Sequence, residues 1–300
     1  MNGIEAYVQA AGVLPPELRR AALTLPPEGQ ALAEELRLRV GRPVTAVFPE
    51  GEVELCGPAI TCGDLERLVE IASRASVHAV LDQIRAGFLT AEGGHRIGLC
   101  GTAVLREGEV HALRQLSSAN VRVARQVKGA SDPVLGEICP GGVLTDTLIL
   151  APPGQGKTTL LRDVIRRVSD GEGCVPRRVA LADERGEVAA LFNGVSQLDV
   201  GRRTDVMAGC PKDRALMLLL RAMNPQVLAV DEITAPEDVS ALHRAAGCGV
   251  TLLATAHGEG LDDLRRRPMY RSLWREGRFR RVVHICRESG KRSYEVEVLG

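Results

Sequence analysis

The sequence predicts an α/β protein, with a smaller mixed α/β domain over residues 1–130 followed by a domain with a mostly parallel sheet over residues 131–300. The length of 300 residues suggests about two domains, and the composition is ordinary for a globular chain, with 45% apolar and 25% charged residues. A stretch rich in Gly and Pro at 128–142 predicts a linker. Beyond it, short apolar runs alternate with helical segments, which is typical of a parallel sheet covered by helices.

The first half combines helical and strand patterns. Apolar residues at helical spacing predict a helix over 16–40. A Pro-Glu-Gly turn between two short runs predicts a hairpin of 43–48 and 52–55. Two further helices and two strands are expected in this half, over 61–75, 76–86, 102–105 and 120–124.

The second half alternates strands and helices along the chain. The expected strands are 147–151, 178–182, 226–230 and 249–255, and the expected helices are 157–168, 213–223 and 236–246. The residues 199–205 predict a polar loop between helices, and the tail predicts a closing hairpin of 280–286 and 293–299.

Charge and composition narrow the class of partner. Lys plus Arg and Asp plus Glu number 38 each, so the net charge is zero, and aromatic residues make up only 3%. We therefore expect no nucleic-acid partner. The eight Cys show neither C-x-x-C nor zinc-ligand spacing, the N-terminus has no leader pattern, and no run of 18 apolar residues occurs. These features predict a cytosolic chain with reduced, mostly buried thiols.

The strongest motif follows the apolar run 147–151 and opens a helix. It reads Pro153-Gly154-Gln155-Gly156-Lys157-Thr158-Thr159. Its glycines permit positive φ and a close approach of backbone N–H groups to a phosphate, and the helix start adds unpaired donors. Lys157 is expected to reach the β- and γ-phosphates and Thr158 to hold Mg²⁺, with a weaker contact from Thr159 to the α-phosphate. The motif predicts a P-loop NTPase domain of the RecA or AAA type; a helix N-cap turn that contains a lysine is the alternative.

One position departs from the phosphate-loop pattern. The motif usually begins with Gly, where this chain has Ala151. Ala is the smallest replacement and falls on the last residue of the expected strand, so we expect it to be tolerated.

A second motif places two acids at a strand end. Asp231 and Glu232 follow the apolar run 227–230. The terminal Asp of the strand that neighbours a phosphate loop completes the Mg²⁺ shell, so Asp231 is the metal candidate and Glu232 the candidate to polarise the attacking water. Taken alone, the motif also fits an acid that caps the following helix.

Four further residues are catalytic candidates. His257 follows an apolar strand and is expected to sense the γ-phosphate or donate to it. Glu184 lies in an acidic turn after a strand and is the candidate to position water. Arg202 and Arg203 are candidate arginine fingers for an adjacent subunit. The alternatives are a histidine that fixes a turn, a solvated charged turn and arginines paired with nearby aspartates.

Several motifs in order resemble the stage III sporulation protein AA family: residues 93–98, 120–125, 151–163, 183–187, 199–206, 210–212, 230–233 and 255–258. This family is similar to the secretion and pilus-type traffic ATPases, which form ring hexamers. The resemblance implies a mother-cell ATPase of endospore formation that uses ATP and Mg²⁺, forms a homo-oligomer expected to be a hexamer, and works with membrane proteins of a channel between mother cell and forespore. It implies a cytoplasmic protein that is peripheral at the membrane through its partners.

Three functions fit the phosphate loop. The first is a motor subunit that hydrolyses ATP with Mg²⁺; the alternatives are a slow nucleotide-binding switch and a RecA-like nucleic-acid motor. Glu232 beside Asp231 favours hydrolysis, because a pure switch does not need it. Zero net charge and few aromatic residues disfavour the nucleic-acid motor.

Overall fold

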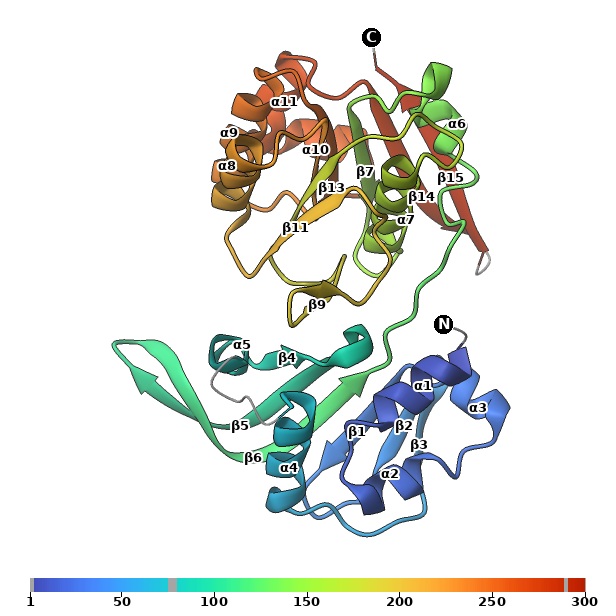
Figure 1. Cartoon of the computed structure of the whole chain (residues 1–300), viewed down its shortest axis with the longest axis vertical. Helices are drawn as coiled ribbons and strands as arrows, with labels where there is room; N and C mark the ends of the chain where they lie inside the picture. The colour runs from blue at the N-terminus through green and yellow to red at the C-terminus, as the bar shows by residue number, and fades with distance from the viewer. Residues whose placement is uncertain (1–2, 75–79, 289–290, 300) are drawn as a thin grey trace. The chain divides into compact units, whose positions relative to one another are not determined.

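The computed structural model describes residues 3–74, 80–288 and 291–299, and the chain forms two compact units (Figure 1). The first unit comprises Met1–Gln126 together with Ala190–Gln197, and the second comprises Val127–Ala189 together with Leu198–Gly300. Among the described residues, no helix is long and apolar enough to cross a membrane.

The first unit is built on a six-stranded antiparallel sheet of order β3-β2-β1-β6-β5-β4. Its strands are β1 Glu35–Arg39, β2 Thr45–Phe48, β3 Gly51–Glu54, β4 Phe88–Thr90, β5 Arg96–Arg106 and β6 Glu109–Arg122. Its helices are α1 Gly3–Ala11, α2 Pro16–Ala22, α3 Pro27–Leu32, α4 Cys62–Ala72 and α5 Leu81–Arg85. One hydrophobic core joins the sheet to α1, α2 and α4. A small hairpin, β9 Leu191–Phe192 and β10 Val195–Ser196, also belongs to this unit.

The helix expected over 16–40 is wrong. The chain forms two short helices there and then enters β1, in which Leu36 and Leu38 are buried and the residues between them are half-buried. Over 35–39 the apolar residues alternate with polar ones at the period of a strand, and this pattern prevails over the helical spacing. Pro26 and Pro27 also start a new helix instead of continuing the first one, because a proline is tolerated at the start of a helix but not in its interior.

Other predictions for the first half are confirmed. The hairpin of β2 and β3 forms as expected, and α4 begins with a capping box in which Thr61 and Asp64 bond each other's backbone N–H. Part of the helix expected over 76–86 lies outside the described residues, and its described part contains α5.

The second unit has a seven-stranded sheet of order β11-β8-β12-β13-β7-β14-β15, in which only β15 is antiparallel. The mostly parallel sheet expected from the sequence is thus confirmed. The strands are β7 Thr147–Ala151, β8 Val179–Asp183, β11 Thr204–Ala208, β12 Val227–Val230, β13 Thr251–His257, β14 Arg281–Glu288 and β15 Lys291–Val298. The helices are α6 Leu135–Ile138, α7 Lys157–Asp170, α8 Lys212–Ala222, α9 Pro236–Ala246, α10 Leu261–Arg266 and α11 Arg271–Arg275.

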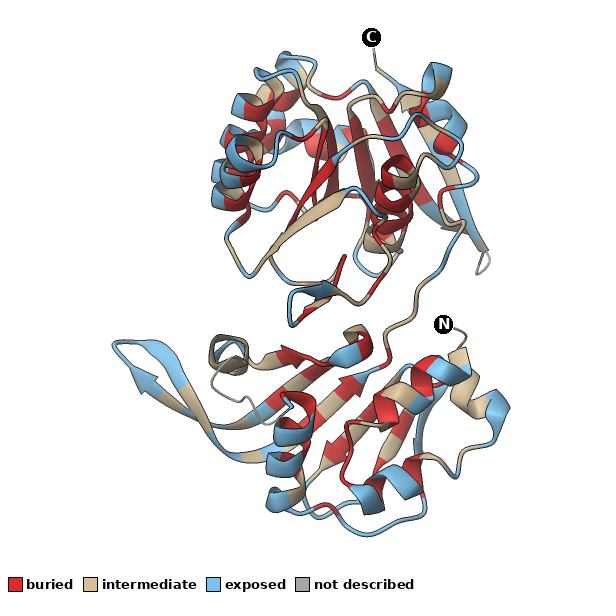
Figure 2. Cartoon of the chain, viewed as in Figure 1, coloured by how far each residue is buried: buried red, intermediate tan, exposed pale blue. Residues whose placement is uncertain are grey.

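Helices cover both faces of this sheet. Leu148 and Leu150 of β7 enter a core with α8 to α11, whereas Ile149 and Ala151 enter a second core with α6 and α7. Figure 2 shows the central strands as the most completely buried part of the unit. Burial on both faces explains why these strands read as continuous apolar runs.

Two expectations about the second half and the thiols are wrong, and a third is confirmed only in part. Much of the linker expected at 128–142 packs on the second unit, because Val134 and Ile138 are buried in its core. The loop expected at 199–205 is present at 199–203, but its last two residues begin β11, a half-exposed edge strand that the sequence pattern did not predict. The thiols are unpaired but not mostly buried. Five of the eight lie on exposed turns, strand positions or helix ends: Cys56, Cys62, Cys100, Cys248 and Cys286.

A buried ion pair fixes α7 behind the phosphate loop. Asp163 on α7 accepts hydrogen bonds from the backbone N–H of Ser131 at 2.9 Å and from its hydroxyl at 2.6 Å, and pairs with Arg166 at 3.0 Å. Burial alone would raise the pKa of Asp163, but Ser131 and Arg166 outweigh it and lower the pKa below its usual value. The carboxylate therefore contributes to stability while it is ionised.

We predict that Asp163→Asn lowers the free energy of unfolding by about 3 kcal/mol, because the buried guanidinium of Arg166 then lacks the negative charge of Asp163. Urea unfolding at neutral pH measures this change. The matched control is Asp132→Asn, which removes an exposed partner of Arg167 and is expected to cost less than about 1 kcal/mol. Equal decreases in the free energy of unfolding for the two variants would show that the buried Asp163–Arg166 pair stabilises the fold no more than an exposed pair does.

Candidate functional site

The phosphate loop joins the end of β7 to the start of α7. Gly154 has φ of +74° and Gly156 has φ of +97°, both in the left-handed region that favours glycine. Gly156 is the N-cap of α7 and contributes no side-chain cap to the helix. The N–H groups of the first helical turn are therefore left for another acceptor, and an anion is the acceptor that a helix N-terminus favours.

Lys157 is buried and points back into the loop. Its Nζ donates to the carbonyls of Ala151 and Pro152 at 2.8 and 2.9 Å and lies 2.7 Å from Nδ1 of His257. Burial lowers the pKa of Lys157, while the negative charges of Glu232 and Asp231 oppose that shift. The positions of these acceptors show where a phosphate would have to compete for the ammonium.

His257 connects Lys157 to Glu232. Because an ammonium only donates, Nδ1 of His257 accepts from Lys157, and Nε2 then carries the hydrogen that faces Oε1 of Glu232 at 2.9 Å. This assignment of the tautomer follows from the partners. The ring thus connects the candidate phosphate-binding group to the candidate general base.

Asp231 receives two threonine hydroxyls. Thr158 donates to its Oδ2 at 3.1 Å and Thr255 to its Oδ1 at 3.0 Å. Burial raises the pKa of Asp231 to about 6 even though both hydroxyls oppose the shift. Such a carboxylate gains from a cation beside it, which is the situation expected of a metal ligand.

The strand order differs from the sequence-based expectation in one respect. Asp231 follows β12, which does not neighbour β7, because β13 lies between them. Thr255 of the intervening strand bridges the gap: its hydroxyl donates to Asp231 and accepts from the backbone N–H of Glu232 at 2.7 Å. The apolar runs in the sequence predict where the strands lie along the chain, but they do not predict the order of the strands in the sheet.

The donor set fits a nucleotide with Mg²⁺. Mg²⁺ binds to one or two protein oxygens plus phosphates and water, and Thr158 with Asp231 offers one hydroxyl and one carboxylate. In the described parts of the chain, no group of three or more His, Cys, Asp or Glu side chains forms an all-protein metal site. Thr158 and Asp231 would therefore hold the metal together with a phosphate at the glycine loop.

Of the remaining residues predicted from the sequence, Glu184 lies at the same end of the sheet as the phosphate loop and the two arginines do not. Glu184 joins the group through Lys212, whose Nζ lies 3.4 Å from its carboxylate. Arg202 and Arg203 precede β11, whose first residue pairs with the first residue of the parallel strand β8. They therefore lie at the amino-terminal end of the strands, whereas the phosphate loop lies at the carboxyl-terminal end. Arg202 pairs with Asp170 at 3.2 Å, and Arg203 donates to a helix carbonyl. The structure does not bring these two arginines to the site of their own chain.

The other loop residues differ in exposure. Pro153 and Gly154 are exposed, whereas Gln155 and Thr159 are half-buried. The side-chain oxygen of Gln155 is buried and has no hydrogen-bond partner among the described residues.

Two residues near the site were missed by sequence reasoning. Lys212 donates to the carbonyl of Glu232 at 2.8 Å. It lies in the motif 210–212 of the family resemblance but received no role, and the signal that could have given it one is that the chain has only four lysines. Arg292 of β15 lies against the phosphate loop, since a Cβ placed on Gly156 would be 3.0 Å from its Cζ. No motif marks Arg292, because its position depends on the register of the hairpin β14–β15, which continues past the end of β7.

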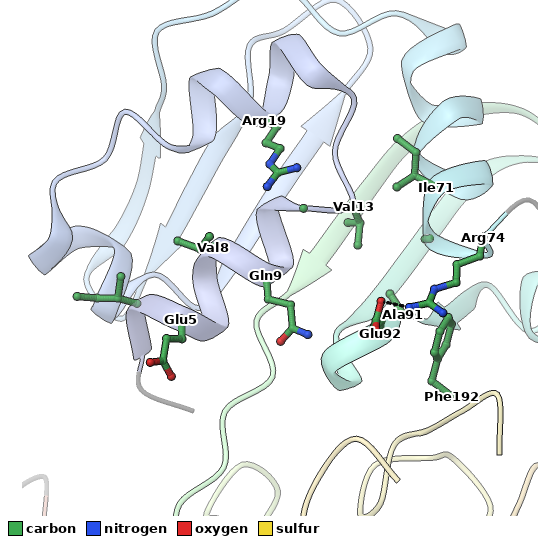
Figure 3. A pocket seen from close by; sticks show the side chains of 13 residues that line it. Glu5, Val8, Gln9, Val13, Arg19, Ile71, Arg74, Ala91, Glu92 and Phe192 are labelled. Carbon is green, nitrogen blue, oxygen red and sulfur yellow. Dashed lines mark hydrogen bonds and ion pairs between the residues drawn. The ribbon is translucent and has the colours of Figure 1, made fainter. Parts of the chain in front are cut away.

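A groove of about 600 Å³ lies in the first unit (Figure 3). Arg74 extends toward Glu92 at one end and stacks over the ring of Phe192 at 5.4 Å from the ring centroid. None of the sequence-predicted site residues lines this groove. All of these predicted residues lie in the second unit, with Arg202 and Arg203 at the other end of its sheet.

Comparison with known proteins places the chain in a family. The family model "Sporulation stage III, protein AA" matches residues 8–296, so the chain belongs to this family. Stage III sporulation protein AA of Bacillus subtilis is 37% identical over 94% of this chain and 92% of its own length. Protein SEEDLING PLASTID DEVELOPMENT 1 of Arabidopsis thaliana is 27% identical over 90% of this chain, which spans 36% of that protein.

Solved structures show the same fold. The pilus retraction motor PilT with bound ADP has a TM-score of 0.62 at 17% identity, covering 89% of this chain and 80% of that one. The ATPase DotB of Legionella pneumophila has a TM-score of 0.59 at 16% identity, covering 88% of this chain and 75% of that one. The fold is thus α/β and similar to that of secretion and pilus ATPases.

We predict that Arg292→Ala weakens ATP binding about tenfold, the size expected for loss of one charge-assisted hydrogen bond. The sheet order places Arg292 on the side of β7 away from Asp231, so we expect an effect on affinity and little effect on any turnover step. Titration calorimetry measures the binding. The control is Arg265→Ala, an exposed arginine that pairs only weakly with Asp262. Unchanged affinity for both variants would remove Arg292 from the site.

Proposed function

We propose that this member of the sporulation stage III protein AA family is a Mg²⁺-dependent ATPase that converts ATP and water to ADP and phosphate and acts as a motor or assembly subunit. The observation that carries the proposal is the chain of contacts from Lys157 through His257 to Glu232. It connects the group that would bind the terminal phosphates to the carboxylate that would orient water.

The geometry supports the proposed role of each residue. Lys157 donates to two loop carbonyls and to His257. A phosphate at the loop competes for the same ammonium, so occupancy of the loop changes the hydrogen bonding of His257. His257 passes that change to Glu232, because its other nitrogen donates there. Hydrolysis is proposed to be coupled to phosphate binding in this way.

Glu232 separates a motor from a slow switch. A module that only binds a nucleotide needs the glycine loop, Lys157 and a metal ligand. It has no use for a second carboxylate that is held by a partner of its own, as the Glu232 carboxylate is by His257. This arrangement favours hydrolysis over the switch.

Oligomer, partners and location rest on the family resemblance. We propose a ring hexamer, in which the adjacent subunit supplies Arg202 or Arg203 to the nucleotide. The side chain of Arg202 is 79% exposed, which suits a contact with another chain. The proposed partners are membrane proteins of a channel between mother cell and forespore, with this chain in the cytoplasm. A RecA-like nucleic-acid motor would share the sheet order, but the zero net charge does not favour it.

We predict that Lys157→Ala abolishes both ATP binding and turnover, because no other described cation takes the place of the ammonium at the loop carbonyls. Phosphate release measures turnover, and calorimetry measures binding. Lys128→Ala is the control, since this exposed lysine pairs with Asp199. Wild-type protein that releases no more phosphate than Lys157→Ala would refute the ATPase proposal.

We predict that Glu232→Gln retains ATP binding but lowers turnover at least about 100-fold, the loss expected when a general base is removed. The same two measurements separate the two effects. The matched control is Glu237→Gln, an exposed residue in the first turn of α9. A Glu232→Gln variant with full turnover would favour the switch over the motor.

A further inference from the structure

Glu232 has an unusual backbone conformation. Its φ is +60°, in the left-handed region that residues other than glycine seldom adopt and that costs free energy unless the surroundings hold it. Two hydrogen bonds hold it here. The N–H of Glu232 donates to Thr255 at 2.7 Å, and its carbonyl accepts from Lys212 at 2.8 Å.

Lys212 is itself in an unfavourable position. It is the first residue of α8, where the helix dipole repels a positive charge, and only 5% of it is exposed. A buried ammonium needs oxygen partners. Besides the Glu232 carbonyl, it has the Thr234 hydroxyl at 2.8 Å, with the carboxylates of Glu184 at 3.4 Å and Asp238 at 3.8 Å.

These partners come from three different elements. Glu232 and Thr234 follow β12, Glu184 follows β8, and Asp238 lies in the first turn of α9. Asp238 is fixed in turn by the N–H groups of Thr234 and Ala235, at 2.9 and 3.0 Å. Lys212 therefore joins the ends of two parallel strands to a helix start.

We propose that Lys212 is a positioning residue that holds Glu232 in its left-handed conformation and keeps Glu184 beside it. This inference rests on the proposed ATPase function for its kinetic consequence. Among the described residues, the hydrogen-bond and ion-pair partners of Lys212 are Glu232, Thr234, Glu184 and Asp238, none of which lies in the phosphate loop, so Lys212 acts through the Glu232 peptide. Without it, the peptide is free to return to an ordinary conformation, and the Glu232 carboxylate no longer faces His257.

The test is Lys212→Met, which keeps the length of the side chain and removes the donors. We expect kcat to fall at least tenfold while KM and the calorimetric affinity for ATP stay within about twofold, because Thr158, Lys157 and the glycines are untouched. Lys212→Arg keeps a cation with donors and is expected to recover part of kcat. Lys128→Met is the matched control and leaves kcat unchanged.

A second readout does not depend on turnover. Hydrogen exchange of the segment 231–235 reports whether the Glu232 peptide is held. We expect Lys212→Met to accelerate exchange there about tenfold or more, the effect of losing one charge-assisted hydrogen bond, while the first unit is unchanged. Thermal unfolding and circular dichroism establish that the variant is folded, and if Lys212→Met does not fold, Lys212→Arg is compared with wild type in the same assays.

The outcomes separate the two proposals. Wild-type protein without turnover refutes the ATPase function, but accelerated exchange at 231–235 would still support the positioning role. Unchanged exchange and unchanged kcat in folded Lys212→Met overturn that role. Equal losses in kcat, ATP affinity and melting temperature, with no recovery in Lys212→Arg, also overturn it, because they show that Lys212 only maintains the fold.

Discussion

The site depends on one buried ammonium. Lys157 fills its three donor positions with two loop carbonyls and Nδ1 of His257, so the phosphate loop is held in shape by the same group that would bind a phosphate. Burial disfavours the charged form, and the nearby carboxylates compensate. An anion at the loop replaces partners that the lysine already has. The free energy needed to arrange these groups is therefore spent when the chain folds and not when a ligand binds. The positive φ values of Gly154 and Gly156 hold the loop backbone in its conformation beforehand.

The parallel sheet brings the other groups to the same edge. Thr158 lies in the first turn of α7, Thr255 lies in β13 and Asp231 follows β12, yet both threonine hydroxyls are within hydrogen-bond distance of the Asp231 carboxylate. Thr255 has the central position, since its single hydroxyl donates to the metal candidate and accepts from the N–H of Glu232. The candidate metal ligand Asp231 and the candidate catalytic residue Glu232 are thus connected through one residue of the strand between β7 and β12.

Sequence reasoning went furthest where the relevant residues are neighbours along the chain. The loop 153–159 is contiguous, so its glycines, lysine and threonines could be identified without knowledge of the fold, and α9 has the bounds expected for it. It failed where a role depends on strand order or register. Thr255 became significant only because β13 lies between β7 and β12, and Arg292 only because the terminal hairpin continues past β7. The helix expected over 16–40 failed because two periodicities overlap there, and burial, which decides between them, is a tertiary property.

The choice of lysine at two buried positions has a physical reason. This chain carries its positive charge almost entirely as arginine, yet the two buried cations at the candidate site, Lys157 and Lys212, are both lysine. The acceptors of each lysine are grouped around its Nζ, and a compact ammonium with three donors can bond to several of them at once. A planar guanidinium instead requires acceptors that are spread along its edge. Arg162 shows the contrast, because two of its nitrogens, Nε and Nη2, donate separately to the successive carbonyls of Val188 and Glu187 after β8. The geometry of the acceptors, more than the need for charge, therefore determines which cation each position holds.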